Sequence, residues 1–253
     1  MQLGLSLGAL ALLTSFVSGL LGAGGAVLLI PLALYVLPLM AGTELDPHQI
    51  SGLVLVQSVA AGLGGGLGFR KHGDLDSRLV WRYGPVLAAG GLAGALLSAL
   101  LPGRALLFAF AVVTSGAALL MLFRPPRAEA PATGRHQAAA VAIFVAISLI
   151  GGTIGIGAGF LIIPVLLYLL AVPPRVASGT ALVLIIFLTA PALLGKAVTG
   201  QLVWAPAAFM AVAAVLGSRL GAHLSPRVPV TPLRLGLAGL VALLAVRVWL
   251  DLL

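Results

Sequence analysis

Long runs of apolar residues, separated by short polar gaps, occupy almost the whole chain. The runs cover residues 3–21, 26–40, 50–69, 80–101, 104–123, 138–154, 158–172, 176–195, 202–224 and 232–252. None sustains the alternation of apolar and polar residues that half-buried strands show, so each run predicts a helix. Most approach the roughly 20 residues that a helix needs to cross about 30 Å of hydrocarbon. The pattern predicts an all-α polytopic membrane protein with 8–10 helical segments.

Two of the runs, 26–40 and 158–172, are short, and each directly follows a glycine-rich stretch. Glycine inside a membrane-compatible run indicates that the backbone leaves regular helix where broken hydrogen bonds are costly. The two stretches match at a constant offset of 133 residues: Gly22, Gly24, Leu28, Ile30, Pro31 and Tyr35 fall on Gly155, Gly157, Leu161, Ile163, Pro164 and Tyr168. The same interruption is therefore expected twice.

The correspondence continues at an offset of 127 after one loop contracts by six residues. Pro47, Ser51, Gly52, Gly73, Gly90, Gly94, Ala95 and Pro102 fall on Pro174, Ser178, Gly179, Gly200, Gly217, Gly221, Ala222 and Pro229. A register held over this length predicts an internal duplication. The chain divides into a first transmembrane repeat at 1–123, a polar, proline-containing linker at 124–137, and a second repeat at 138–253, each repeat having five segments and beginning with a glycine-interrupted helix pair.

The relative direction of the two repeats depends on how the first two segments of each are connected. If they form one broken span, the repeats run parallel; if they form a hairpin, of full crossings or of a re-entrant pair, the repeats are inverted. The inverted arrangement leaves only Arg104, Lys196 and Arg247, of fourteen Lys and Arg residues, on the minority face. Because cytoplasmic loops carry an excess of these residues, we expect inverted repeats with both termini periplasmic.

Composition agrees with a membrane protein and excludes several classes. Hydrophobic residues make up 61% of the chain and charged residues 8%, with a mean hydropathy of +1.20, whereas soluble domains carry about 25% charged residues. The net charge of +8 is scattered over the polar gaps, so membrane orientation explains it better than nucleic-acid binding. The absence of cysteine removes thiolate chemistry and cysteine-ligated metals.

The paired interruptions are the strongest candidate for a binding site. A phosphate-cradling glycine loop would require a preceding strand, which the pattern lacks. Close helix packing by small residues remains an alternative. Interrupted segments at matching positions of two halves favour a site near the bilayer midplane, where freed amides hold an anion. The predicted substrate-binding residues of the interruptions are Gly24, Gly25, Gly157, Ala158 and Gly159, and the predicted hinge or helix-break residues are Gly22, Pro31, Gly155 and Pro164.

Polar residues within the following helices extend this candidate site. They are Ser51, Gln57, Ser178, Thr180 and Lys196. The hydroxyls either cap their helices or donate to a ligand. The Gln57 side chain needs a partner, which is a neighbouring helix or the substrate, and Lys196 is a functional residue or reaches the nearby interface.

Other patterns favour structure over chemistry. Gly90 with Gly94 and Gly217 with Gly221 predict helix packing, within one subunit or between the subunits of a homodimer. Arg247 and Asp251 have the i,i+4 spacing of a helical ion pair. Acidic residues lie in gaps or at the C-terminus, and neither a metal-ligand cluster nor a catalytic set is present. We therefore predict a protein that is not an enzyme and needs no cofactor.

At residues 19–25 leading to Pro31, at 155–159 leading to Pro164, and at the basic-glycine-acidic turn 70–76, the sequence resembles the sulfite exporter TauE/SafE family. The resemblance covers nearly the whole chain. It implies a bacterial inner-membrane carrier of small sulfur-containing anions such as sulfite, thiosulfate or organosulfonates. The motif glycines and the serines at 51 and 178 carry over. Ala158 stands where the first half has Gly25, so the two half-sites are not expected to be identical.

The sequence and the resemblance together predict a secondary transporter working by alternating access, with a lipid bilayer and a small sulfur-containing anion as partners and with proton or sodium coupling left open. An anion channel or a membrane scaffold that does not transport is the alternative. A channel would favour continuous polar rows on several helices, and the sequence shows isolated polar positions.

Overall fold

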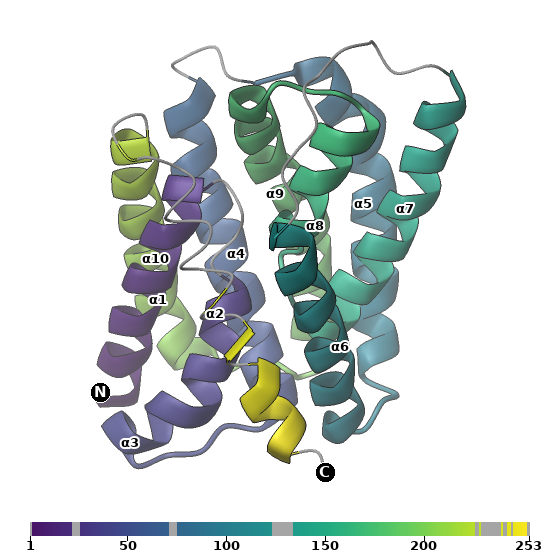
Figure 1. Cartoon of the computed structure of the whole chain (residues 1–253). Coiled ribbons are helices and arrows are strands. Elements are labelled where there is room, and N and C mark those ends of the chain that lie inside the picture. Colours follow the sequence, from purple (N-terminus) through teal and green to yellow (C-terminus); the bar gives the residue numbers. More distant parts are fainter. Residues whose placement is uncertain are drawn as a thin grey trace.

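The computed structural model describes residues 2–21, 26–70, 75–122, 134–225, 228, 239, 242–243 and 245–251. Within these residues all regular structure is helical (Figure 1). The first half contains α1 (Gln2–Leu21), α2 (Ala26–Pro31), the π-helix η1 (Leu32–Val36), α3 (Leu37–Ala41), α4 (Pro47–Arg70), α5 (Ser77–Ser98) and α6 (Gly103–Leu122). The second contains α7 (Gly134–Ile154), α8 (Gly159–Pro164), the π-helix η2 (Val165–Leu169), α9 (Pro174–Val198) and α10 (Trp204–Leu224).

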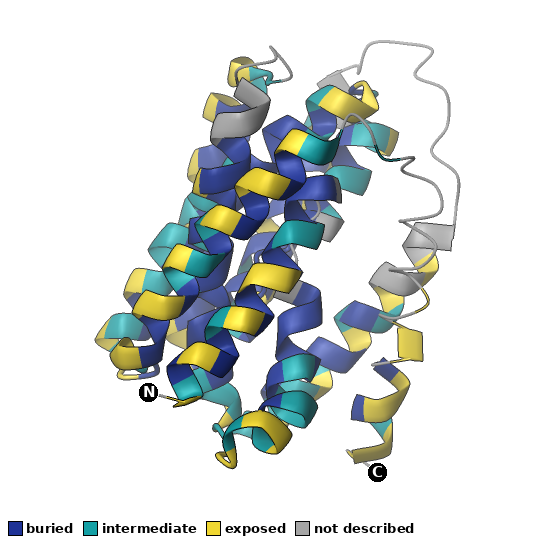
Figure 2. Ribbon diagram, turned by 90° about the vertical axis from the view of Figure 1, so that its left-hand side faces the viewer, coloured by how far each residue is buried: buried dark blue, intermediate teal, exposed yellow. Residues whose placement is uncertain are grey.

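The predicted all-α class is confirmed, and helices occupy each predicted apolar run. Of the last run, 232–252, the described residues are helical. Within the part of the chain that the structure describes, four helices are long and apolar enough to cross a membrane: Gln2–Leu20, Gln137–Ile154, Pro174–Val198 and Trp204–Leu224. Figure 2 shows exposed positions on the outer faces of the helices and buried positions turned inward. Large apolar side chains such as Leu5, Leu194 and Val212 are exposed there, which is where lipid would contact them.

The first two segments of the first half form a hairpin. Gln2 Nε2 at the start of α1 donates to the backbone oxygen of Met40 in α3 at 3.1 Å. The segment 26–41 therefore returns to the face from which α1 starts, which excludes a single broken span. In Figure 1, α1 and α4 run upward while α7 and α9 run downward, which are the directions that inverted repeats require.

The long helices pack in a symmetric order. The most extensive packing joins α1 to α10, α10 to α4, α4 to α9, α9 to α5, and α5 to α7. Exchanging the first half for the second, so that α1 replaces α7, α4 replaces α9 and α5 replaces α10, leaves this order unchanged. Helices α4 and α9 therefore form the central pair, and each half contributes one of them.

The outer pairs are held together by the small-residue patterns. A Cβ added at Gly94 of α5 would meet the Leu149 oxygen and the Thr153 nitrogen of α7, and one added at Gly221 of α10 would meet the Phe16 oxygen and the Leu20 nitrogen of α1. The two contacts are related by the sequence offsets of 127 and 133. Of the two predicted packing modes, these glycines use the one within a subunit, where the absence of a side chain lets backbones approach closely.

Candidate functional site

The second glycine interruption separates α7 from α8 at residues 155–158. Gly155 has φ +82° and Ala158 has φ +44°, so both lie in the left-handed region that L side chains rarely adopt. Ile154, Gly155, Ile156, Gly157 and Ala158 are all buried. The predicted break therefore exists as an irregular segment inside the protein, and its alanine takes a conformation that glycine would adopt at lower cost.

The segment that follows the break is too short to cross a membrane. Helix α8 has six residues and η2 has five, so together they extend about 16 Å at about 1.5 Å per residue. This is about half of the hydrocarbon thickness. Pro164 ends α8 and the π-helix begins after it, as Pro31 ends α2 before η1, because proline lacks the N–H that the regular helical ladder needs. The segment α8–η2 by itself therefore covers only part of the membrane thickness.

Gly157 lies between the middles of the two central helices. A Cβ at this position would be 2.9 Å from Ser58 Oγ and 3.2 Å from Ile185 Cγ2. Ser58 lies near the middle of α4, and Ile185 lies near the middle of α9. These two residues are equivalent at the 127-residue offset. The break is thus at mid-depth, at the interface between the halves.

Ser51 of α4 lies beside the same break. A Cβ at Gly155 would meet the Ser51 hydroxyl and its backbone oxygen. Ser51 is only 2% exposed, and its Oγ has no hydrogen-bond partner. Leaving a buried hydroxyl unpaired costs about 1–3 kcal/mol. The predicted alternative of a capping role is not seen, and the hydroxyl is available to a ligand.

Gln57, the residue directly before Ser58 on α4, is buried against α1. Its Nε2 donates to Thr14 Oγ1 at 2.7 Å and to Ser15 Oγ at 3.0 Å. Its Oε1 has no partner. The neighbouring helix therefore supplies the partner of the amide nitrogen, while the amide oxygen remains unpaired.

Lys196 near the end of α9 is fully buried and hydrogen-bonded. Its Nζ donates to Ser98 Oγ and to Gln201 Oε1, each at 2.8 Å, and to the Thr153 backbone oxygen at 3.4 Å. These groups are uncharged. His48 Nδ1 lies 3.2 Å from the same Gln201 Oε1. We call Lys196, Ser98, Gln201 and His48 the lysine cluster. Lys196 does not reach the interface, which was one of its two predicted alternatives.

The remaining predicted site residues that the structure describes do not gather at the break. Thr180 is buried, and its Oγ1 accepts from the Asp76 backbone nitrogen at 3.0 Å, so it fixes the loop before α5. Ser178 is half-buried on α9, and Gly159 begins α8. Gly22, Gly24 and Gly25 lie outside the described residues. The structure thus places Gly155 beside Ser51 and Gly157 beside Ser58, and the lysine cluster adjoins them through the contacts of Gly52 with Gln201 and of Thr153 with Lys196.

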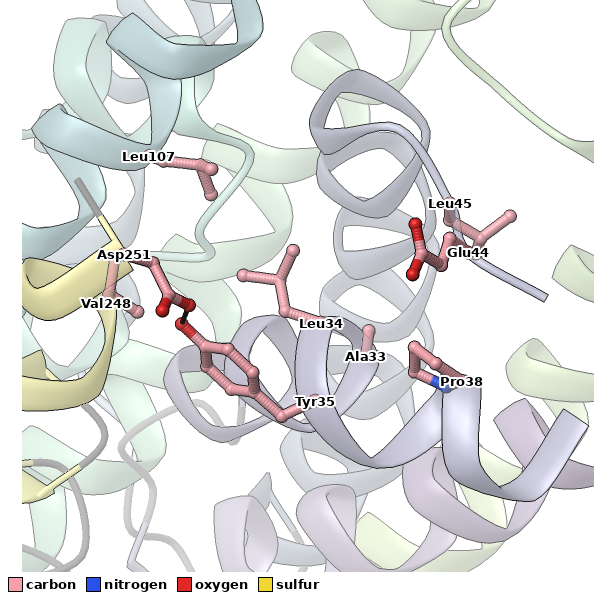
Figure 3. Close-up of a pocket in the computed structure, with 9 residues that line it drawn as sticks. All are labelled: Ala33, Leu34, Tyr35, Pro38, Glu44, Leu45, Leu107, Val248 and Asp251. Carbon is pink, nitrogen blue, oxygen red and sulfur yellow. Dashed lines mark hydrogen bonds between the residues drawn. The ribbon is translucent and has the colours of Figure 1, made fainter. Parts of the chain in front are cut away.

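Two cavities lead from the face that carries the termini toward Ser51. The outer cavity has a volume of about 230 Å³, and Figure 3 shows the side chains that line it: Ala33, Leu34, Tyr35, Pro38, Glu44, Leu45, Leu107, Val248 and Asp251. The inner cavity, about 10 Å³, is lined by Ile30, Leu34, Pro47, Ile50, Ser51, Leu106, Leu107, Phe110 and Ile154. Its lining is apolar except for Ser51.

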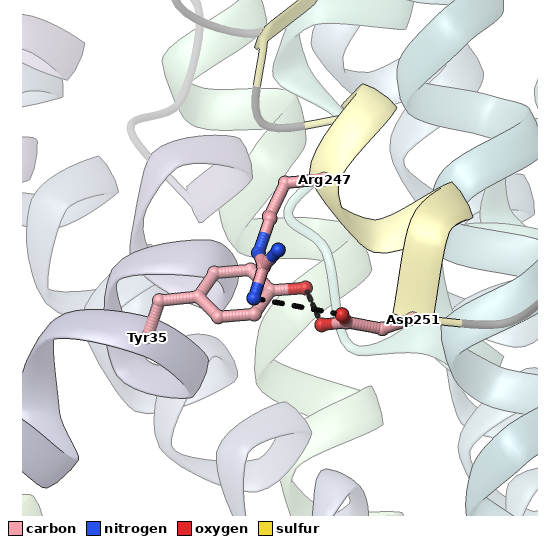
Figure 4. Close-up of polar contacts among 3 residues, drawn as sticks. All are labelled: Tyr35, Arg247 and Asp251. Atoms are coloured by element: carbon pink, nitrogen blue, oxygen red, sulfur yellow. Dashed lines mark hydrogen bonds and ion pairs between the residues drawn. The ribbon is translucent and has the colours of Figure 1, made fainter.

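The C-terminal segment (residues 245–251) closes one side of the outer cavity. Arg247 Nη2 lies 3.7 Å from Asp251 Oδ1, which confirms the predicted i,i+4 pair. Tyr35 of η1 donates from its hydroxyl to Asp251 Oδ2 at 2.6 Å, and the Arg247 guanidinium lies over the Tyr35 ring, 5.4 Å from its centroid (Figure 4). The helical pair therefore also binds the π-helical turn.

Sequence reasoning missed several partners in these clusters. Ser98 and Gln201 complete the lysine cluster, and Leu34 and Leu107 line both cavities. Gln201 had a signal, because it is a polar residue five positions after an isolated lysine. The leucines had none, since leucine is common throughout the apolar runs.

Comparisons with known proteins agree with this architecture. The family model described as Sulfite exporter TauE/SafE matches residues 7–248. A probable membrane transporter protein of Xylella fastidiosa (strain 9a5c) is 31% identical over 227 residues, covering 85% of this chain and 82% of the relative. The probable membrane transporter protein YunE of Bacillus subtilis (strain 168) is 25% identical over 237 residues, covering 85% and 86%. No solved structure matches the chain.

Proposed function

We propose that this protein moves small sulfur-containing anions by alternating access. The premise is its family: the chain belongs to the Sulfite exporter TauE/SafE family of membrane transporters. Sulfite, thiosulfate and organosulfonates are the candidate substrates. The proposed site lies where residues 155–158 meet α4 and α9, and the proposed location is the bacterial inner membrane with periplasmic termini. Proton or sodium coupling and a homodimeric assembly belong to the same proposal.

The observation that carries the proposal is the unpaired Ser51 hydroxyl beside a break in the chain at mid-depth. Ser51 Oγ is buried without a partner, and the adjoining residues Gly155 and Ala158 have left-handed backbone conformations. An oxyanion that accepts a hydrogen bond from this hydroxyl would satisfy a group that is otherwise costly to bury. Gly157 presents no side chain between Ser58 and Ile185, which lets the break lie closely between the two central helices.

The charges of the described residues favour an anion over a cation. The acidic side chains Glu44, Asp46, Asp76 and Asp251 lie in gaps or in the C-terminal segment, not at the break. Lys196 is buried one turn away among uncharged acceptors. Its charge raises the local potential, while its hydrogen bonds to Ser98, Gln201 and Thr153 fix its position. We assign it an electrostatic role, with no direct contact to the substrate required.

The symmetric order of helices supports alternating access. Each half contributes one central helix and one interrupted hairpin, so rocking one half against the other would expose the same central site to opposite faces. The inner cavity is small and almost wholly apolar, which is unlike the continuous polar row that a channel needs. A channel is therefore the weaker alternative.

Transport into proteoliposomes tests the proposal. Purified protein would be reconstituted and supplied with labelled sulfite, thiosulfate or sulfoacetate, with and without imposed proton and sodium gradients. We expect saturable uptake of at least one anion that a second anion inhibits, and uptake that a gradient accelerates. Flux that rises linearly with concentration would indicate a channel. Absence of flux for every anion, together with no thermal shift on anion addition, would contradict the proposed function.

A further inference from the structure

The two cavities meet at the same pair of leucine side chains. Leu34 of η1 and Leu107 of α6 line the outer cavity and also the inner cavity that contains Ser51. The outer cavity has polar groups from Tyr35, Glu44 and Asp251, whereas the inner one has Ser51 as its polar lining residue. An ion moving from the outer cavity to Ser51 would pass these two apolar side chains, and an apolar constriction excludes water and ions.

Leu34 is carried by a helix of unusual geometry. It lies in the five-residue π-helix η1, between Pro31 and the regular helix α3. Single-turn π-helices are rare and occur frequently at functional sites. The backbone of this turn is thus a place where a small rotation can move a side chain without breaking a long regular helix.

The C-terminal segment contacts both elements that carry the leucines. Asp251 accepts the hydrogen bond of Tyr35, the residue next to Leu34. Two residues before Asp251, Trp249 donates from Nε1 to Ser115 Oγ of α6 at 3.2 Å and packs edge-on against Phe108, the residue next to Leu107. One short segment therefore connects η1 to α6 on the side of the leucine pair.

We infer that Leu34 and Leu107 form a gate between the termini-bearing face and the Ser51 site, and that the C-terminal segment holds this gate closed. The inference rests on the proposed transport function for its purpose. The Tyr35–Asp251 hydrogen bond restrains η1, and the Trp249 contacts restrain α6. Releasing either restraint lets the leucines separate and opens the route from the outer cavity to Ser51.

Thiol labelling tests the gate without measuring transport, because the chain contains no native cysteine. A Ser51→Cys variant would be treated, from the face that carries the termini, with a membrane-impermeant methanethiosulfonate reagent. We expect slow labelling in this background, and labelling about tenfold faster when Leu34→Ala, Leu107→Ala or Tyr35→Phe is added, because each change raises the population of the open gate. Ile50→Cys, in the same inner cavity, provides a second reporter if Ser51→Cys folds poorly.

Two matched controls separate the gate from general loosening. Leu39→Ala removes a leucine that is 87% exposed and lines neither cavity. Tyr168→Phe removes the hydroxyl at the equivalent position of the second half. Neither is expected to change the labelling rate. Equal labelling in the gate variants and the background, or equal acceleration by the controls, would overturn the inference.

The gate and the proposed transport function can be contradicted independently of each other. A gate that responds as expected in a protein without anion flux would leave the gate standing and contradict the proposed function. Saturable anion uptake in a protein whose Ser51→Cys labelling ignores Leu34 and Leu107 would leave the function standing and contradict the gate.

Discussion

Two neighbouring groups of buried polar residues differ in how completely they are hydrogen-bonded. In the lysine cluster, the Lys196 ammonium group has three acceptors within 3.4 Å. At the break, Ser51 Oγ has no partner although Ser51 is 2% exposed. The groups adjoin each other, since Gly155 contacts Ser51 while Thr153 contacts Lys196. A complete hydrogen-bond network stabilises one arrangement of the chain. An unpaired buried hydroxyl can instead gain a hydrogen bond from a bound ligand.

Each of the two groups combines residues from both halves of the chain. The lysine cluster draws Lys196 and Gln201 from the second half and Ser98 and His48 from the first. It therefore fixes one half against the other in the protein interior, near the end of α9. The break draws its irregular backbone from the second half and its hydroxyl from the first. We interpret the first group as structural support and the second as the place where substrate completes the hydrogen bonding.

The largest effect is expected from filling the space at the break. Gly157→Leu would place a side chain where even a Cβ is 2.9 Å from Ser58 Oγ and 3.0 Å from its Cβ. We expect transport to be abolished while the protein still inserts, because the flanking helices are unchanged. Uptake into proteoliposomes measures the first effect, and chromatographic monodispersity measures the second. Gly116→Leu is the control, because a Cβ there has nothing within 4 Å. Normal transport by Gly157→Leu would make the glycines mere packing residues.

A large loss of stability is expected from breaking the complete network. Lys196→Met leaves the acceptors of Gln201 and Thr153 without their charged donor, at a cost of about 2–3 kcal/mol. Thermal unfolding in detergent would show a clearly lower midpoint. Arg219→Met, which removes an exposed cation from α10, should leave the midpoint nearly unchanged. An unaltered midpoint in Lys196→Met would show that the cluster does not support the fold.

A smaller effect of opposite sign is expected at the break itself. Ala158 has φ +44°, and replacing it by glycine relieves a left-handed conformation that costs an L residue about 1–2 kcal/mol, less the entropy that glycine loses. Ala158→Gly should therefore raise the thermal midpoint slightly and preserve transport. A lower midpoint would indicate that the Ala158 methyl group is needed for packing, because this residue is only 1% exposed.

Local features of the fold were predictable from the sequence because they depend on spacing and composition. The short runs 26–40 and 158–172, the irregularities at Pro31 and Pro164, and the Arg247–Asp251 pair all follow from local rules of helix geometry. The choice between a hairpin and a broken span did not follow from them. The distribution of Lys and Arg favoured the hairpin, and the contact between Gln2 and Met40 shows it.

The partners of the site residues were not predictable, because they come from distant parts of the chain. Lys196 bonds Ser98 across 98 positions, and Gly155 contacts Ser51 across the boundary between the halves. Isolated polar residues signal that a partner exists, not which residue it is. The substrate contacts of the first interruption remain a prediction, since Gly22, Gly24 and Gly25 lie outside the described residues.

The most direct test compares two serine hydroxyls that differ only in their hydrogen bonding. Ser98 Oγ contacts the Ala95 oxygen, Gln201 and Lys196, whereas Ser51 Oγ has no partner. Thermal unfolding and anion uptake would be measured for Ser51→Ala and Ser98→Ala side by side.

We expect Ser98→Ala to lose about 1–3 kcal/mol of stability, and Ser51→Ala to keep or gain stability because it removes a buried hydroxyl that has no hydrogen bond. Ser51→Ala should instead lose most of its anion uptake and its anion-induced thermal shift. A Ser51→Ala protein that transports normally, or that is destabilised as much as Ser98→Ala, would contradict the assignment of the substrate site to the break.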